Sequence, residues 1–400
     1  MNKKLLLAIG LSAACSGQIV AQSESNDSVK GFVFTDEIIV PTTSVKDQNK
    51  SGTCWCFAGT SHFEDEIMHN GGDSLNLSEM FTVRYCYLDK ARRHILSQGN
   101  SHFSAGGSIL DVPYVWDTYG AVPESAYEGL NYGETKHDHG ELDKAITAYV
   151  HAVATGKKAT TAWLQGLNGI LDAYFGAVPE KFIVDGKEYT PRTYADHLGL
   201  KSDNYVALTS FTHHPEYKPF VLEVADNWLA GQYYNLPLTE FKTVVDHALQ
   251  QGYSVVWAAD VSEDGFKWKE GYALLPAEKT ESDMDATELA RWVKLSDADR
   301  KAEQAKIDGP GVKEIDVTPE IRQQMFETLQ TTDDHGMVIV GTATDQLGNR
   351  YYKVKNSWDT NQIYDGYFYV SEPYFLAKTL SVLINRKGVP SKTLKALNLK

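Results

Sequence analysis

The chain has 400 residues, of which 42% are hydrophobic and 23% charged, and this composition excludes a disordered or repeat protein. Its net charge of −15 argues against nucleic acid as a partner, because phosphate binding needs clustered Lys and Arg. The length suits one large domain or two to three ordinary ones.

The first 21 residues are typical of a signal peptide. Lys3 and Lys4 precede an apolar stretch that is too short to span a membrane and that ends in small residues. We expect cleavage after Ala21, which changes the net charge from −15 to −15 − 2 = −17. The mature protein is then exported, periplasmic or secreted, without stable membrane association. Cys15 leaves one alternative open, because its lipidation would anchor the protein.

The next segment predicts an extended stretch and then a helix that begins at a cysteine. The extended stretch is FVFTDEIIV at 32–40, and apolar residues recur at helical spacing from Thr53 until Gly71 and Gly72 end the pattern. Cys54 therefore lies at the start of the helix. There the helix dipole and the free backbone N–H groups favour a thiolate.

Two more helices are predicted before a long middle region. One begins after Ser78, which is suited to cap it, and the other follows the pair Gly106 and Gly107 and ends at Gly120.

The middle region, residues 135–330, is predicted to be mostly helical. Residues 140–158 and 238–252 have the pattern of amphipathic helices, whereas 253–261, YSVVWAADV, is typical of a buried strand. The charged stretch 285–311 alternates in sign, which indicates a solvated surface segment.

The last part of the chain changes to a strand pattern. Residues 335–345, 350–358 and 366–372 alternate with period two around turn sequences, and a helix is expected over 388–400. Helices followed by a sheet predict an α+β architecture whose two halves face each other across a cleft.

The cysteines favour a nucleophile over a metal or disulfide site. Without the leader, Cys54, Cys56 and Cys86 remain, an odd number that fits no disulfide framework. A zinc site needs four ligands, usually with paired CxxC cysteines, and the chain has only CxC. Pairing of Cys56 with Cys86 stays open. We expect no metal and no cofactor, and Cys54 becomes the candidate nucleophile.

A thiol nucleophile needs a base, a group that orients the base, and donors for an oxyanion. His335 begins a predicted strand, and the following hairpin would return Asn356 beside it, where the amide oxygen could hold the Nδ1–H. Gln48 and the backbone N–H of Cys54 could stabilise the oxyanion. Each residue alone is more often structural, so the hypothesis depends on their joint order.

Three motifs in this order resemble the papain superfamily of cysteine peptidases: QNKSGTCWCFA at 48–58, DDHGMVIVG at 333–341 and KNSW at 355–358. The resemblance implies the roles of the matching residues, which are the nucleophile Cys54, the general base and acid His335, the orienting Asn356, the oxyanion donor Gln48, the shielding ring Trp358, and the substrate-pairing backbone of Gly106 and Gly107.

The spacing between Cys54 and His335 indicates which branch of the papain superfamily the chain resembles. His335 follows Cys54 by 335 − 54 = 281 residues, whereas papain and cathepsins have roughly 130–150. Four longer stretches resemble the bleomycin hydrolase and aminopeptidase C branch, at 103–125, 188–210, 233–261 and 367–375. That branch implies a papain-like two-lobed fold with a large helical insertion, and a hexamer with an internal chamber. We divide the chain after the leader into a helical lobe (22–134), the insertion with the start of the β lobe (135–315), and the β lobe (316–400).

The expected function is hydrolysis of peptide bonds by a Cys-His-Asn triad. The resemblance implies an aminopeptidase whose Cys54 and His335 rest as a thiolate–imidazolium pair. Two alternatives stay open. An endopeptidase with an open cleft is one, because the C-terminal arm of this branch is short here, and a non-catalytic peptide-binding protein is the other.

Overall fold

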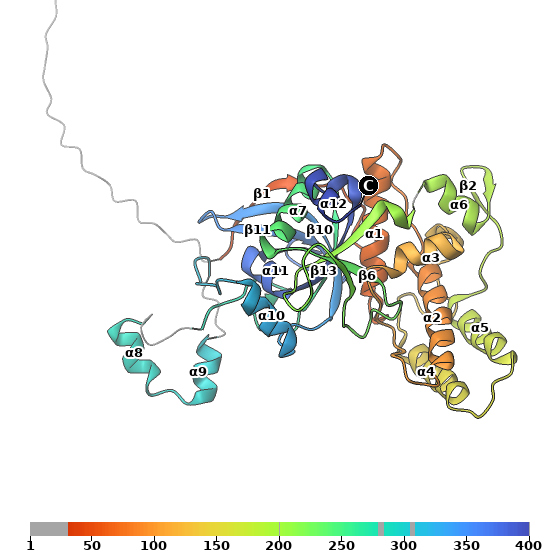
Figure 1. Ribbon diagram of the computed structural model, residues 1–400, viewed down its shortest axis with the longest axis horizontal. Coiled ribbons are helices and arrows are strands. Elements are labelled where there is room, and N and C mark those ends of the chain that lie inside the picture. Colours follow the sequence, from red (N-terminus) through yellow and green to blue (C-terminus); the bar gives the residue numbers. More distant parts are fainter. Residues whose placement is uncertain (1–30, 200, 279–283, 305–308, 400) are drawn as a thin grey trace, which may run out of the picture.

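The computed structural model describes residues 31–199, 201–278, 284–304 and 309–399 (Figure 1). The predicted leader, with Cys15 and the cleavage point after Ala21, lies outside these residues. Within these ranges, each helix is too short or too polar to reach across a bilayer.

An 11-stranded mixed sheet forms the centre of the molecule, in the order β5-β6-β4-β13-β7-β10-β11-β12-β9-β8, with β1 beside one half of β10 (Figure 1). The strands are β1 (Phe34–Ile39), β4 (Tyr205–Thr209), β5 (Pro219–Val221), β6 (Gln232–Asn235), β7 (Val255–Ala259), β8 (Phe266–Lys267), β9 (Tyr272–Ala273), β10 (His335–Asp345), β11 (Arg350–Lys355), β12 (Tyr367–Ser371) and β13 (Thr379–Asn385).

The two faces of the sheet carry separate hydrophobic cores, because neighbouring side chains of a strand point to opposite faces. On β7, Val256 and Ala258 join the core around α1 (Cys54–His69), whereas Val255 and Trp257 join the core around α7 (Leu238–Gln250). The central strands are therefore apolar on both sides, as covered strands must be.

Helix α1 is buried on every side. It contacts β10 and β7, and α2 (Glu79–Leu96) and α3 (Asp111–Tyr119) cover its other side. Its side chains from Trp55 to Ile67 are all buried, including acidic ones. A Cβ at Gly59 would lie 2.6 Å from Val112 Cγ2, so the glycine permits the close approach of α3.

The helical insertion extends from α2. Helices α4 (Gly140–Ala154) and α5 (Ala162–Phe175) pack on α2, and α6 (Pro191–Leu198) packs on α3 (Figure 1). A two-stranded hairpin, β2 (Phe182–Val184) and β3 (Lys187–Tyr189), precedes α6. This part confirms the predicted helices of the region.

The prediction of a mostly helical middle is wrong beyond residue 204. Strands β4, β5, β6, β8 and β9 lie in that stretch and join the central sheet. They are two to five residues long. Hydrophobic periodicity cannot separate such short strands from buried helix segments.

The remaining elements lie around the sheet. Helices α8 (Ala286–Trp292) and α9 (Asp297–Gln304) stand away from the body in Figure 1, as expected for the charged segment. The others are α10 (Pro319–Glu327), α11 (Glu372–Lys378), α12 (Ser391–Ala396) and the short 3₁₀ turns η1 (Glu124–Ala126), η2 (Ser202–Asn204) and η4 (Arg386–Gly388). Thr393 of α12 donates to Glu240 of α7 at 2.6 Å, so α12 packs over α7.

Candidate active site

Cys54 is the first residue of α1, at an open helix end. The preceding residue, Thr53, makes no side-chain cap hydrogen bond, so the first N–H groups of the helix keep their donors for another partner. Cys54 is partly exposed, whereas Cys56 and Cys86 are fully buried, and all three thiols are free. Of the cysteines that the structure describes, Cys54 is the one that a substrate could reach.

Gly336 brings the start of β10 against this helix end. A Cβ at Gly336 would lie 3.0 Å from Trp55 Cα and 3.4 Å from the carbonyl carbon of Cys54. The close approach brings the neighbouring residue, His335, to the start of the helix that begins at Cys54. Pairing of His335 with Ala259 of β7 holds the backbone there, and the imidazole is 5% exposed.

Asn356 fixes the imidazole. Its Oδ1 lies 2.7 Å from Nε2 of His335, and it also accepts from the N–H of Ser357 at 2.8 Å. An amide oxygen only accepts, so Nε2 carries the proton and Nδ1 of the neutral ring stays free to take one. The predicted pairing is confirmed, but its assignment to Nδ1 was wrong, because a sequence does not determine how the ring turns.

Trp358 covers the imidazole from the other side. Its ring centroid lies 4.5 Å from that of His335, with 32° between the planes. Trp268 packs edge-on against Trp358 at 5.5 Å. These rings surround the histidine with apolar surface.

Gln48 is held by a residue that the sequence analysis missed. Ser357 Oγ donates to Gln48 Oε1 at 2.6 Å, and the backbone N–H of Gln48 donates to Ser357 O at 2.8 Å. The amide oxygen is thus occupied, and the amide NH₂ remains as a donor. The signal was present in KNSW, where Ser357 lies between two residues to which we assigned roles.

Gly106 and Gly107 lie beside the start of α1. A Cβ at Gly107 would be 2.7 Å from Cε2 of Trp55, whose indole N–H donates to Ala105 O at 3.0 Å. At Gly106 a Cβ would be 2.1 Å from Oδ2 of Asp226, a second residue that the sequence analysis missed. Their pairing with substrate stays a prediction.

Burial disfavours charge on either reacting side chain alone. It raises the pKa of Cys54 to about 11, although the N–H groups of Gly336 and Trp55 act against the shift. It lowers the pKa of His335 to about 4, although the bond to Asn356 acts against it. The N–H groups at the helix start favour the thiolate, as predicted, but desolvation by burial has the larger effect on the pKa of the thiol.

The free energy of charging Cys54 and His335 together differs from that of charging each residue alone. Passing the proton from Sγ to the imidazole creates both charges side by side, so their attraction offsets part of the desolvation. The predicted thiolate–imidazolium pair depends on this offset and stays a prediction.

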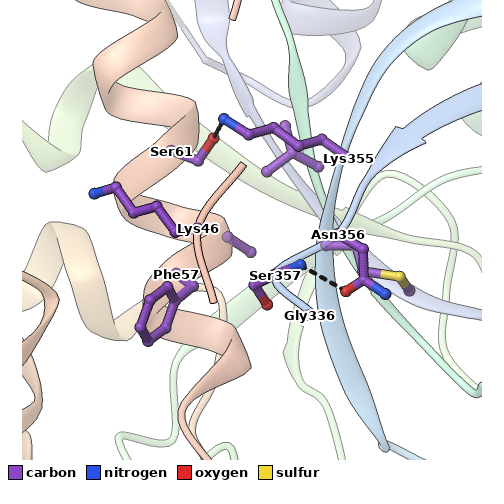
Figure 2. Close-up of a pocket in the computed structure, with 10 residues that line it drawn as sticks. Lys46, Phe57, Ser61, Gly336, Lys355, Asn356 and Ser357 are labelled. Atoms are coloured by element: carbon purple, nitrogen blue, oxygen red, sulfur yellow. Dashed lines mark hydrogen bonds between the residues drawn. The ribbon is translucent and has the colours of Figure 1, made fainter. Parts of the chain in front are cut away.

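A small cavity lies between α1 and strands β10 and β11 (Figure 2). Phe57 and Ser61 line it from the helix, and Gly336 of β10 lines it together with Asn356 and Ser357, which directly follow β11. Cys54 and His335 are not among its lining residues.

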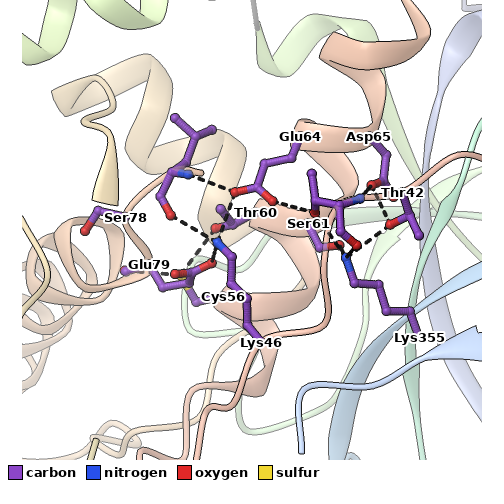
Figure 3. Close-up of polar contacts among 12 residues, drawn as sticks. Thr42, Lys46, Cys56, Thr60, Ser61, Glu64, Asp65, Ser78, Glu79 and Lys355 are labelled. Atoms are coloured by element: carbon purple, nitrogen blue, oxygen red, sulfur yellow. Dashed lines mark hydrogen bonds and ion pairs between the residues drawn. The ribbon is translucent and has the colours of Figure 1, made fainter. Parts of the chain in front are cut away.

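A buried polar network continues from this cavity and ties the surrounding elements together (Figure 3). Lys46 contacts Glu64 of α1 at 3.0 Å and Glu79 of α2 at 2.6 Å. Lys355 of β11 donates to Ser61 Oγ at 2.9 Å and to Thr43 O at 2.7 Å. The network explains why α1 can bury acidic side chains.

One group of side chains among the described residues could hold a metal ion. It consists of His213, His214 and Glu223, with the two Nε2 atoms 3.2 and 2.7 Å from the carboxylate. The group lies around β5, on other elements than those that carry Cys54 and His335. Hydrogen bonds between the rings and the carboxylate account for the arrangement.

Two family models of known proteins match this chain, each over a different part of it. The model of the papain family of cysteine proteases matches residues 35–182, and that of the peptidase C1-like family matches residues 313–400. The first match contains Cys54 and Gln48, and the second contains His335 and Asn356.

Curated relatives match over nearly the whole length. Aminopeptidase C of Lactobacillus delbrueckii subsp. lactis is 22% identical, covering 99% of this chain and 91% of the relative. Aminopeptidase G of the same organism is 24% identical, covering 95% and 89%. Aminopeptidase C of Listeria monocytogenes is 22% identical, covering 92% and 85%.

The fold also matches a solved structure. The crystal structure of PepW from Lactobacillus rhamnosis superposes with a TM-score of 0.66 at 19% identity, covering 91% of this chain and 84% of the other. This likeness concerns the fold.

Proposed function

The chain belongs to the papain superfamily of cysteine peptidases, in the branch of aminopeptidase C and bleomycin hydrolase, and we propose that it removes residues from the N-termini of peptides with Cys54, His335 and Asn356. The observation that carries the assignment of residues is the 2.7 Å bond between His335 Nε2 and Asn356 Oδ1. It leaves Nδ1 as the basic atom on a ring that Gly336 holds against the start of α1.

In the proposed first step the Cys54 sulfur attacks the carbonyl carbon of the scissile peptide. Its proton passes to Nδ1 of His335, and the carbonyl oxygen becomes an oxyanion. The backbone N–H of Cys54 and the NH₂ of Gln48 donate to that oxygen. Asn356 stabilises the imidazolium through the Nε2–H bond.

The intermediate then collapses. The C–N bond breaks as His335 returns its proton to the leaving amine, and an acyl group remains on the Cys54 sulfur. Water attacks this thioester and gives a proton to His335. The C–S bond then breaks, the carboxylic acid product leaves, and His335 returns the proton to the Cys54 sulfur. The steps balance without a metal or a redox partner.

Cys54→Ala tests this proposal. We expect the variant to lose hydrolysis of a free-amine aminoacyl-coumarin, while its circular dichroism and melting temperature match those of the wild type. In the wild type, iodoacetamide should modify one thiol, because Cys56 and Cys86 are fully buried. A fully active Cys54→Ala protein would falsify the proposal. So would activity that survives alkylation but is lost with a chelator.

The second candidate is an endopeptidase. The described C-terminal residues pack over α7, where Leu397 is buried, and not beside Cys54. Because α7 and α1 belong to the cores on opposite faces of the sheet, the described C-terminal residues do not occupy the site, which supports this candidate. A pair of substrates that differ only in an acetyl group on the α-amine separates the candidates: an aminopeptidase cleaves the free-amine form, whereas an endopeptidase cleaves both.

We further propose export of the protein and assembly into an oligomer. The predicted leader with cleavage after Ala21 supports export, with lipidation at Cys15 as the alternative. The family resemblance supports a hexamer. Mass spectrometry of the mature N-terminus and light scattering of the purified protein test the two points separately.

A further inference from the structure

Two carboxylates lie beside the nucleophile without a role in the proposed triad. Asp226 comes from the loop between β5 and β6, and Asp333 precedes His335 by two residues. Repulsion by each of them raises the pKa of the Cys54 thiol, after the larger effect of burial. Two segments far apart in the sequence thus place negative charge at the thiol.

Asp226 lies directly over the glycine backbone of the site. The position that a Cβ of Gly106 would take is 2.1 Å from Oδ2 and 2.9 Å from Oδ1. Its polar contacts are long, with Ser104 Oγ and His102 Nε2 each 3.5 Å from Oδ1. The side chain is 21% exposed, so a ligand on Gly106 can reach the carboxylate.

Asp333 is partly buried, and its carboxylate makes no hydrogen bond or ion pair with any residue that the structure describes. Burial, followed by repulsion from Asp226, Asp334 and Asp111, raises its pKa to about 7. Like charges are therefore concentrated here, and an unpaired carboxylate in such a place costs folding free energy. Perturbed groups of this kind cluster at functional sites.

Lys90, whose ammonium lies at the same loop, is already occupied. The ammonium of Lys90 donates to the backbone oxygens of Ser104 and Gly106 and packs on Trp55. Asp111 has its own donors, Trp228 Nε1 at 2.6 Å and Ser108 Oγ at 3.0 Å. The long contacts of Asp226 and the missing partner of Asp333 among the described residues leave these two carboxylates available to a cation from outside.

We propose that Asp226 and Asp333 form an anionic subsite that binds an ammonium group of the substrate, and that this group is the α-amine of the residue to be removed. The inference rests on the peptidase function proposed above. In a bound substrate the α-amine is two bonds, or about 2.5 Å, from the attacked carbonyl carbon. The α-amine therefore stays close to the start of α1, where Asp226 lies over the backbone of Gly106, and relatives of this chain carry the name aminopeptidase.

A basic side chain offers the same chemistry from a second source. The lysine ammonium lies at the end of a four-carbon stem, so it could enter the subsite from the residue before the scissile one. The experiment has to separate the α-amine from this side chain.

The test compares Asp226→Asn and Asp333→Asn with the wild type on three coumarin amides: alanyl, acetyl-alanyl and acetyl-lysyl-alanyl. Asn keeps the shape of the side chain and removes the charge. Asp203→Asn, an exposed carboxylate on η2, is the matched control. We expect kcat/KM for the alanyl substrate to fall about tenfold to 100-fold in each subsite variant, through KM, as for a lost charge pair. Acetyl-alanyl amide carries no ammonium group, so any activity that the wild type has on it should not fall through KM in these variants.

The thiol provides a readout that a misfolded variant would not give. Because both carboxylates raise the pKa of Cys54, each Asn variant should be alkylated by iodoacetamide somewhat faster than the wild type. Slower alkylation together with a lower melting temperature indicates a structural role and overturns the inference.

The other outcomes are also decisive. A loss confined to the acetyl-lysyl substrate assigns the subsite to a basic side chain and overturns the α-amine assignment. An unchanged preference for free-amine substrates in both variants overturns the subsite itself. Neither result bears on the peptidase proposal, which the Cys54→Ala variant and the alkylation experiment test separately.

Discussion

At the scale of single residues, function depends on which atoms are occupied and which stay free. Asn356 occupies Nε2 of His335 and leaves Nδ1 free for its proposed role as the base. Ser357 occupies the oxygen of the Gln48 amide and leaves its NH₂ as a donor. Adjacent residues of one short motif thus orient two side chains from distant parts of the chain.

Replacement of His335 by Asn should expose the intrinsic acidity of the buried thiol. Without the imidazole, Cys54 ionises with a pKa of about 11, so the thiolate is nearly absent at neutral pH and appears as the pH rises through that value. At pH 7 its fraction is about 10⁻⁴. Iodoacetamide alkylation followed by mass spectrometry between pH 5 and pH 11 measures this. A variant that keeps the wild-type rate at pH 7 would show that the thiol does not depend on His335.

Ser357→Ala should impair the oxyanion donor indirectly. Loss of the 2.6 Å bond frees the Gln48 amide to rotate. We expect kcat to fall about tenfold with little change in KM, whereas Gln48→Ala costs about 10²–10³ in kcat, the range for one oxyanion donor. In the double variant the effects should not add, because both act through the same amide. Full additivity in the steady-state kinetics would contradict this positioning role.

At the scale of elements, the site is a contact between the start of α1 and the start of β10. No disulfide links these two elements, because the described cysteines are free. In the sequence, His335 follows Cys54 by 281 positions (335 − 54). The sheet holds β10 between β7 and β11, and α2 and α3 press α1 onto it. Glycines at the tightest points let the backbones approach.

Gly336→Ala should separate the two elements. The new Cβ would lie 3.0 Å from Trp55 Cα, an atom of helix backbone that cannot turn aside. Small displacements of reacting groups cost about 10²-fold in rate, so we expect kcat/KM to fall by about that factor with the fold retained. Gly169→Ala is the control, because open space surrounds Gly169 in α5. Equal kinetics for the two variants would mean that the contact is not critical.

At the scale of the whole molecule, the buried polar network joins the N-terminal segment to α1, α2 and β11 (Figure 3). Its ion pairs are shielded from water, with Glu64 fully buried. Such a network adds little net stability compared with apolar packing, but removal of one member leaves buried charges unpaired.

Lys46→Met should therefore destabilise the whole chain. Glu64 and Glu79 would lose their shared cation, and breaking a buried pair costs about 3–5 kcal/mol of the free energy of unfolding. Urea denaturation measures the change. Lys50→Met is the control, because the pair of Lys50 with Asp138 is exposed and such pairs contribute little. Similar midpoints for the two variants would argue against a structural role for the network.

The sequence by itself determined the chemistry and the general architecture. The order of Gln48, Cys54, His335 and Asn356 within their motifs indicated a thiol peptidase, and the long helices α1, α2, α4 and α7 and strands β10 to β12 followed from strong periodicity. These signals are local, since a motif or an amphipathic pattern is complete within a few turns of the chain.

The tertiary structure decided what depends on distant contacts. Short strands such as β4 and β6 exist because they pair in the sheet, and their few residues carry no period of their own. The ring orientation of His335, the raised pKa of Cys54 and the meeting of Asp226 with Gly106 all result from packing between segments that the sequence separates. Burial and close approach are properties of the folded chain, and they set how the predicted residues can act.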